Sequence, residues 1–427
     1  MSEPQAPKSG VDLDHLFRSE SGRMVAVLTR LFGVHNLSLA EDVVQDAFFR
    51  ALQVWKFHGM PENPSAWLMT TAKNRALDVL RRRRTALTFA PELGRMLDSE
   101  WTLVPTLEEQ FQPHAIQDDL LRMMFTCCHP SLSEEAQVTL VLHILCGFSV
   151  GEVAAAFVAT PAAIEKRITR GKKTLATSQD LFDVTKDEAF DARLHAVQRA
   201  LYLLFNEGYH GASPDHAVHA ELCWEAMRLA RHLREHPRGA TPATHALAAL
   251  MCLHAARLPG RLDAAGDLHS LLDQDRGRWD RELMGEGQRL LDLSASGPEL
   301  TSYHVEAAIA WIHAQAPSVA ETDWGQIVAL YDTLLRIQPS PVVALNRAIA
   351  VAQHEGAEAG LHALEAIEDR ERLARYPFYP AALGELELRR GRPEAARRHF
   401  KDALGLARNP TERRFLQQRM EASAPTH

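Results

Sequence analysis

The sequence lacks the features that mark membrane, secreted and disulfide-rich proteins. No run of about eighteen apolar residues occurs among its 427 residues, so no transmembrane helix is expected. The N-terminal segment MSEPQAPKSG has no charged region followed by an apolar one, so we expect no signal peptide and a cytoplasmic protein. The five cysteines are odd in number and form no CxxC pair, which predicts buried thiols and no metal site.

Two further absences narrow the fold class and the activity. No convincing alternation typical of β-strands occurs, whereas apolar residues recur at helical spacing throughout, which predicts an all-α fold. No base, nucleophile and metal ligands stand together at a recognisable spacing, so we expect no enzyme and no cofactor. Asp273 and Asp275 beside Arg276 are expected in a solvated turn or an inter-helix salt bridge, although an enzyme in the C-terminal part stays an alternative.

Positive charge is scarce overall but concentrated in two segments. The chain has 47 Lys+Arg against 55 Asp+Glu, a formal net charge of −8. Residues 73–84 contain six basic residues and one acid, and residues 166–173 contain five basic residues and no acid. Such local clusters matter more for contact with nucleic acid than the total charge does.

The first basic cluster ends a predicted pair of helices. Residues 38–55 predict a helix that starts with a capping box of Ser38 and Glu41. A loop rich in Gly, Pro and Asn follows, and a second helix spans residues 66–84. The apolar positions that recur at helical spacing in the first helix are Val43, Val44, Ala47, Phe48, Ala51 and Leu52. In the second helix Leu68, Ala72 and Val79 share a core-facing stripe, opposite Asn74, Asp78 and Arg81.

The second basic cluster belongs to a predicted three-helix segment over residues 132–175. Gly147 and Ser149 mark the first turn, Thr160 caps the last helix, and Pro161 fits its first turn. In that last helix Ile164, Ile168 and Leu175 share one face, opposite Lys166, Arg170 and Lys173, with Arg167 beside them. This arrangement is typical of a helix-turn-helix recognition element, and a plain amphipathic helix is the alternative.

The C-terminal part contains a degenerate repeat. From about residue 305, residue types and spacing fit the tetratricopeptide pattern at Trp311, Ile327, Tyr331, Leu334, Leu383, Gly384, Gly391, Ala396, Phe400 and Ala403. Stacked helix pairs of this kind form a concave surface, for which we expect a protein or peptide partner. The alternative is an unrelated helical bundle.

The motifs together resemble the extracytoplasmic-function (group 4) sigma factors of bacterial RNA polymerase. The segment AEDVVQDAFFRAL resembles the region 2 helix that binds the polymerase clamp, and NPSAWLMTTAKNRALDVLRRRR resembles the segment that reads the minus-ten element. Residues 132–175 resemble region 4, which reads the minus-thirty-five element. The phrase DDLLRMMFTCCHP and the long tail are similar to sigma factors with a C-terminal helical-repeat extension.

The resemblance implies a domain plan and a set of contacts with core RNA polymerase and promoter DNA. Region 2 would span residues 11–85 and would be followed by a linker at residues 86–113. Region 4 would span residues 114–178, and the C-terminal helical domain would span residues 184–427. The implied polymerase-binding residues are Asp42, Gln45, Asp46 and Phe49. Those implied for the minus-ten element are Trp55, Phe57, His58, Asn74, Asp78, Arg81 and Arg82, although core packing is the alternative for the tryptophan. Those implied for the minus-thirty-five element are Ala163, Glu165, Lys166, Arg167, Arg170 and Lys173.

The expected function is therefore that of a sigma factor with a regulatory tail. Glu165 departs from the family, which often has a basic or hydroxyl residue there, and glutamate accepts a hydrogen bond from cytosine N4, so the promoter sequence is expected to differ. The runner-up is a one-component helix-turn-helix regulator with a helical-repeat sensor. That alternative leaves residues 38–84 without a role.

Overall fold

The computed structural model describes residues 13–88, 113–157, 159–177, 187–210, 219–261, 269–374, 376–407 and 410–423. These residues form helices, turns and loops, and no β-strand occurs among them, so the predicted all-α class is confirmed. The chain divides into an N-terminal unit, residues 1–154 with 159–200, and a C-terminal unit, residues 155–158 with 201–427. Within the described part, no helix combines the length and the apolar character needed to cross a bilayer.

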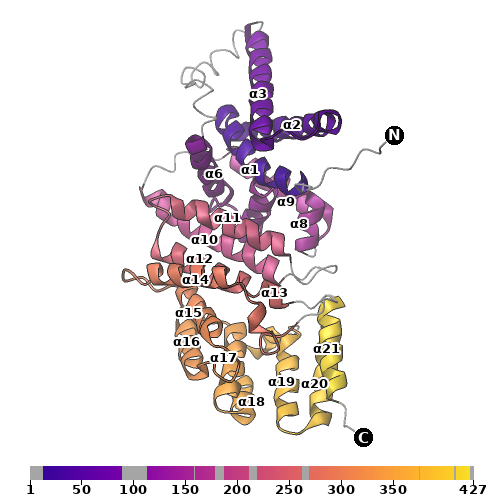
Figure 1. Cartoon of the computed structure of the whole chain (residues 1–427), viewed down its shortest axis with the longest axis vertical. Helices are drawn as coiled ribbons and strands as arrows, with labels where there is room; N and C mark the ends of the chain where they lie inside the picture. Colours follow the sequence, from indigo (N-terminus) through magenta and orange to yellow (C-terminus); the bar gives the residue numbers. More distant parts are fainter. Residues whose placement is uncertain are drawn as a thin grey trace, which may run out of the picture. The chain divides into compact units, whose positions relative to one another are not determined.

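The N-terminal unit is built around α1 (Leu13–Phe32). Residues 24–28 of α1 are all buried, because α2, α3 and α6 pack around it. Gly22 is required there, since a Cβ atom at this position would lie 2.1 Å from the carbonyl oxygen of Leu145. The other elements are η1 (Val34–Asn36), α2 (Leu37–His58), α3 (Pro64–Thr88), α6 (Pro113–Cys127), α7 (Glu134–Leu140), η2 (Val141–Leu145), α8 (Val150–Ala156), α9 (Pro161–Thr177) and the first part of α10 (Asp187–His210) (Figure 1).

Two details of the predicted first helix are wrong. Helix α2 starts at Leu37 and directly follows the short 3-10 helix η1, so Ser38 and Glu41 form no capping box. The Glu41 carboxylate instead lies 2.6 Å from Lys172 Nζ, an ion pair between two helices. Leu52, expected with the apolar positions, is 50% exposed. In α3 the predicted core residues Leu68 and Ala72 are both 0% exposed.

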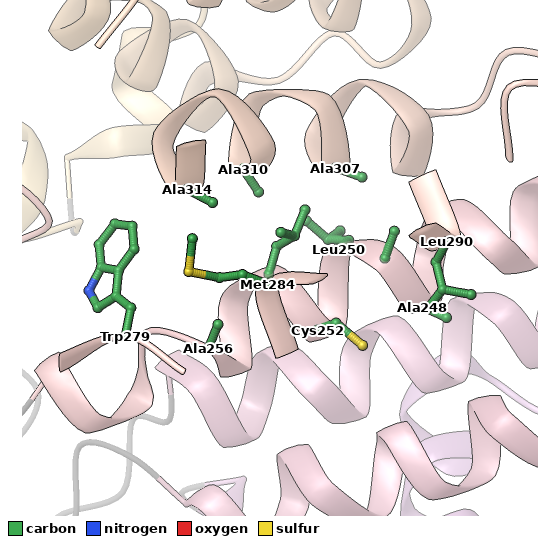
Figure 2. Close-up of a cluster of buried hydrophobic side chains, with 12 residues drawn as sticks. Ala248, Leu250, Cys252, Ala256, Trp279, Met284, Leu290, Ala307, Ala310 and Ala314 are labelled. Carbon is green, nitrogen blue, oxygen red and sulfur yellow. The ribbon is translucent and has the colours of Figure 1, made fainter. Parts of the chain in front are cut away.

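The C-terminal unit has a core of small and aliphatic side chains. Helix α12 (Pro242–Ala255) is buried along most of its length and packs against α14 (Arg281–Ser294) and α15 (Ser302–Gln315). Figure 2 shows alanines 307, 310 and 314 of α15 facing Met284 and Leu250, with Trp279 at one end of the cluster. The remaining elements before α15 are α11 (Ala220–Glu235), α13 (Leu258–Arg261) and η3 (Arg276–Arg278).

Helical hairpins follow α15 in sequence order, and each packs mainly on its neighbours (Figure 1). They comprise α16 (Trp324–Ile337), α17 (Pro341–His354), α18 (Ala357–Glu365), η4 (Arg370–Leu373), α19 (Phe378–Arg389), α20 (Pro393–Gly405) and α21 (Pro410–Ala422). Gly384 gives room to the buried Phe400 ring, 3.0 Å from where a Cβ would lie, and Gly391 turns the chain at φ 73°. Gly384 therefore has a packing role, and Gly391 has a turn role.

The cysteines and the acidic turn have structural roles. All five cysteines are buried and free, as predicted, and burial raises the pKa of Cys128, Cys223 and Cys252 to about 12. Asp275 accepts a hydrogen bond from Gly277 N at 2.8 Å, as a turn residue does. Arg276 is buried and donates to the carbonyl oxygens of His313 and Ala316 at 3.0 and 2.8 Å. It thereby satisfies carbonyl groups at the C-terminal end of α15.

Candidate nucleic-acid interface

The exposed face of α2 carries the residues implied for polymerase binding. Asp42, Gln45, Asp46 and Phe49 are all exposed, whereas Val43, Val44, Ala47 and Ala51 face the core. Phe49 is 63% exposed, and Leu52, one turn further along, is 50% exposed. The sequence pattern placed Leu52 among the core positions of this helix and therefore missed it as a surface residue, because an apolar side chain next to the core residue Ala51 is compatible with either the core or the surface face. Exposed apolar side chains gathered on one polar helix face mark a surface for another macromolecule.

An ion pair and a polar groove join α2 to α3. The Asp46 carboxylate lies 2.8 Å from both Nε and Nη2 of Arg75, a two-nitrogen contact that fixes one helix against the other. A groove of about 620 Å³ runs between them and is lined by polar groups of both helices. Its lining includes Asp46, Arg50, Trp67, Asn74, Arg75 and Asp78. Asn74 and Asp78 therefore lie together, as the helical spacing predicted.

The aromatic residues near the α2–α3 loop divide into exposed and buried members. Phe57 is 79% exposed, with Lys56 Nζ 5.9 Å from its ring centroid, and His58 is exposed beside it. Trp55, in contrast, is 8% exposed and packs on Phe17 and on Trp67, with centroids 6.0 and 5.4 Å away. We assign Trp55 to the core, because a ring held between two aromatic neighbours has no open face for a base.

The basic end of α3 is partly described. Arg82 is exposed on the helix, one turn after Asp78. The side chain of Arg81 lies outside the described residues. Exposed cations such as Arg82 provide phosphate neutralisation, and Phe57 with Lys56 beside it offers a ring for base stacking; single-stranded nucleic acid is bound by both kinds of contact.

Helix α9 presents an apolar face to α7 and a basic face to solvent. Ile164, Ile168 and Leu175 are at most 5% exposed, and Gly171 allows close packing on Leu140 of α7. The outward positions, as predicted, are Ala163, Glu165, Lys166, Arg170 and Lys173. Among the residues that the structure describes, no carboxylate lies within 4 Å of the three cations in that set, so their charges are available to an anionic partner.

Arg167 differs from its neighbours on α9. Its Nη2 atom lies 2.9 Å from the Glu135 carboxylate, and its Nη1 atom donates to Thr139 Oγ1 at 3.4 Å. Both partners lie on α7, so this arginine links α9 to α7. It is half-buried and, within the described part of the chain, is the only residue of the predicted set on α9 that forms a side-chain ion pair.

The turns around α8 orient α9. Before α8, Glu152 N donates to Ser149 Oγ at 3.2 Å, and the Glu152 carboxylate accepts from Ser149 N at 2.8 Å, a reciprocal cap. Before α9, Thr160 Oγ1 accepts from Ala163 N at 3.3 Å, which confirms the predicted cap. Two helix starts close together in sequence therefore fix the helix that carries the basic face.

Direct ion pairs join the α1–α2 segment to the α6–α9 segment inside the N-terminal unit. Lys172 binds Glu41, and His143 Nε2 lies 3.8 Å from the same carboxylate. Arg30 of α1 binds the fully buried Asp119 of α6 at 3.0 Å. The two motif-bearing segments thus pack against each other rather than standing apart.

Comparisons with known proteins agree with the N-terminal geometry. Residues 16–86, which contain α2 and nearly all of α3, match the model of Sigma-70 region 2. Residues 193–295 match a family of unknown function, DUF6596. The chain is 38% identical over 412 residues to the uncharacterized protein R00370 of Rhizobium meliloti (strain 1021), covering 96% of this chain and 95% of the relative.

Proposed function

Because this chain belongs to the family of its Rhizobium meliloti relative and contains a sigma-70 region 2, we propose that it is a sigma factor of the extracytoplasmic-function group. It binds core RNA polymerase and directs promoter-specific initiation in the cytoplasm. One observation carries the proposal: the region 2 match falls on α2, whose outward face combines exposed acids with Phe49 and Leu52.

The proposed polymerase surface is the outward face of α2. Asp42, Gln45 and Asp46 supply polar contacts at its start, and Phe49 and Leu52 supply apolar anchors further along. Centrally placed apolar anchors surrounded by polar residues are the usual arrangement of a strong protein interface. Asp46 also binds Arg75, so it positions α3 relative to the polymerase surface.

The proposed minus-ten surface lies on the α2–α3 loop and α3. Phe57 and His58 would stack on unpaired bases, Asn74 and Asp78 would contact base edges, and Arg82 with Arg81 would neutralise phosphates. Trp55 takes no part, because it is buried.

The proposed minus-thirty-five surface is the outward face of α9, as the third helix of a region 4 helix-turn-helix. Lys166, Arg170 and Lys173 would contact phosphates or base edges in the major groove, with Ala163 and Glu165 at the N-terminal end that enters it. Arg167 positions α9 through Glu135 and contacts DNA only if that ion pair opens.

The C-terminal unit is proposed as a regulatory domain of stacked, tetratricopeptide-like hairpins, with a concave surface for a protein or peptide partner. The packing of Gly384 against Phe400 and the positive φ of Gly391 between α19 and α20 support this reading. No enzymatic role is proposed for it.

Reconstitution with core polymerase tests the sigma function against the one-component regulator. The purified chain, core polymerase and a library of genomic fragments are combined, and run-off transcripts are sequenced. A sigma factor yields transcripts with common start sites only when core polymerase is present, and it binds duplex DNA weakly without polymerase. Specific duplex binding by the chain alone, with no stimulation of core polymerase, would instead establish the regulator.

A further inference from the structure

The C-terminal unit contains a cavity of about 690 Å³ formed by its own helices. This volume falls in the range of about 300–1,000 Å³ that is usual for small-molecule sites. The walls come from α10, α12, α15, α16 and α17 and are rich in aromatic and aliphatic side chains. Representative wall residues are Tyr202, Phe205, Tyr209, Leu250, Tyr331 and Tyr376.

Arg257 is the most unusual group in this wall. Arg257 is only 4% exposed, and its Nη2 atom donates a hydrogen bond to the carbonyl oxygen of Ala310 at 3.1 Å. The buried Nε–H has no hydrogen-bond partner, and no carboxylate of the described residues lies within 4 Å of the guanidinium. A buried arginine normally has a carboxylate partner, since leaving its charge and its five donors unmatched is costly.

A second arginine lies at the same end of the cavity. The guanidinium of Arg261 sits 4.1 Å from the ring centroid of Tyr209, and its buried Nε–H also lacks a hydrogen-bond partner. Burial lowers the pKa of Arg257, Tyr209 raises it through its charge and a side-chain hydrogen bond, and the nearby positive charge of Arg261 lowers it. The structure therefore places two like charges near each other, without a described carboxylate between them.

The carboxylates that line the cavity do not neutralise this end. Glu306 accepts a hydrogen bond from Tyr202 OH at 3.0 Å, and neither Glu306 nor Glu412 lies within 4 Å of Arg257 or Arg261. Burial and Glu306 raise the pKa of Tyr331 to about 12, so its hydroxyl stays protonated and offers a donor. Burial lowers the pKa of His313 to about 3, so this wall residue is neutral at pH 7.

We propose that this cavity binds a small organic anion with an aromatic or apolar body, whose carboxylate, phosphate or sulfonate group lies between Arg257 and Arg261. The anion supplies a negative charge for the two guanidinium groups and acceptors for their unpartnered Nε–H donors. The aromatic wall covers the body of the ligand. The Trp279 ring packs on Arg257, with its centroid 5.3 Å from the guanidinium carbon. The site stands on the C-terminal unit alone and does not depend on the proposed sigma function.

Two dyes that differ by one sulfonate test the proposal on the full chain. 8-Anilino-1-naphthalenesulfonate carries the anionic group, and N-phenyl-1-naphthylamine has the same aromatic body without it. Both become fluorescent in apolar surroundings. We expect the sulfonate dye to saturate at a single site per chain and to bind at least about tenfold more weakly to Arg257→Gln and to Arg261→Gln. The affinity for the neutral dye should change less than about twofold, which corresponds to less than about 1 kcal/mol of binding free energy.

Control variants separate the charge effect from a folding defect. Arg289→Gln removes an exposed arginine that pairs with Glu286 outside the cavity, and it should leave both dyes unaffected. Arg257→Lys keeps the charge and should retain more affinity for the sulfonate dye than Arg257→Gln does. Arg261→Gln changes a half-buried side chain. It therefore still tests the contribution of the charge if circular dichroism shows that the Arg257 variants do not fold.

Three outcomes would overturn the proposal. The first is the absence of saturable sulfonate-dye binding to the unmodified chain. The second is equal weakening of both dyes by Arg261→Gln. The third is unchanged sulfonate-dye affinity in folded variants of both arginines.

Discussion

The basic face of α9 and the ion-paired arginines of the C-terminal unit present their charges differently. On α9 of the N-terminal unit, Lys166, Arg170 and Lys173 point to solvent without an ion-pair partner among the described residues. In the C-terminal unit, several arginines are instead held by carboxylates. The pairs there include Arg228–Glu225, Arg234–Glu286, Arg289–Glu286, Arg347–Asp332, Arg390–Glu358 and Arg419–Glu385. The comparison teaches that a net charge of −8 says little about binding, because, in the described part of the chain, some cations are held in ion pairs within the fold and others are not.

The apolar surface shows a similar contrast. The N-terminal unit exposes Phe49, Leu52 and Phe57 on neighbouring parts of α2, at 63%, 50% and 79%. In the C-terminal unit Leu293 is comparably exposed, at 46%, but lies at the end of α14. A cluster on a helix face favours a partner, whereas single exposed apolar residues are normal on any protein.

The largest effect is expected on the α2 face. The double variant Phe49→Ser/Leu52→Ser should lose core-polymerase affinity by more than about 2 kcal/mol, since buried apolar anchors dominate interface energies. Stability should change little, because both side chains are exposed. The measurement is a titration with labelled core polymerase. Leu293→Ser, with a similarly exposed leucine in the other unit, is the matched control. Full affinity in the double variant would remove α2 as the polymerase surface.

The next effect is expected on the basic face of α9. Arg170→Ala should weaken promoter binding by the polymerase complex by about 1–3 kcal/mol if a base contact is lost, and should lower its salt dependence. A pre-melted promoter should be less sensitive to this variant than to Asn74→Ala. Arg347→Ala, which breaks an ion pair of the C-terminal unit, serves as the control and should leave DNA binding unchanged. An equal loss of promoter binding in Arg170→Ala and Arg347→Ala would mean that the presence or absence of an ion pair does not predict which arginine contacts DNA.

Arg167 allows a finer test of the same comparison. The sequence placed it with Lys166 and Arg170, because helical spacing puts them close together. Spacing along one helix cannot reveal Glu135, which comes from α7 and pairs with Arg167 at 2.9 Å. For the same reason the sequence identified Glu41 as a cap, whereas its partner Lys172 lies 131 positions away. Local patterns predicted the helices, the Thr160 cap and the apolar face of α9, but they misassigned the Ser38 cap and the face of Leu52, and tertiary ion pairs were beyond them.

Trp55 and the ligand cavity illustrate the same limit. The aromatic residues near basic ones in the sequence favoured a role for Trp55 in stacking on DNA bases. Its actual packing between Phe17 and Trp67 depends on how α1, α2 and α3 meet, which the local sequence does not reveal. The cavity around Arg257 brings together helices from residue 202 to residue 415, so no short motif marks it. The helical hairpins after α15, in contrast, follow local spacing, because each hairpin packs on its neighbour in the chain.

An intermediate effect is expected from acid on the C-terminal unit. Burial, and the nearby Arg257 and Arg276, lower the pKa of His313 to about 3, well below its unfolded value of about 6.5. The unfolded chain therefore binds a proton that the folded chain rejects, and the resulting stability is present above pH 6.5 and decreases as pH falls toward 3. At pH 5, about 1.5 units below the unfolded pKa, the loss from this one group is about 2 kcal/mol.

The measurement is urea unfolding at pH 7 and pH 5. His313→Leu should narrow the stability difference between the two pH values, even if it destabilises the protein at both. His362→Leu changes an exposed histidine of the same unit and should leave the difference unchanged. If the two variants narrow the difference equally, His313 is not the group responsible.

The smallest effect separates two adjacent lysines of α9. Lys172 binds Glu41 with both side chains mostly buried, 20% and 17% exposed, whereas Lys173 is exposed and has no ion-pair partner among the described residues. Lys172→Met should therefore lower the free energy of unfolding of the N-terminal unit by about 1 kcal/mol, between the values typical of surface pairs and of fully buried ones. Lys173→Met should leave stability unchanged and should weaken promoter binding, because its charge is free for phosphate. A double-mutant cycle with Glu41→Gln measures the coupling of the pair directly. If Lys173→Met destabilises the fold as much as Lys172→Met does, the division between structural and binding cations fails at the one place where both occur side by side.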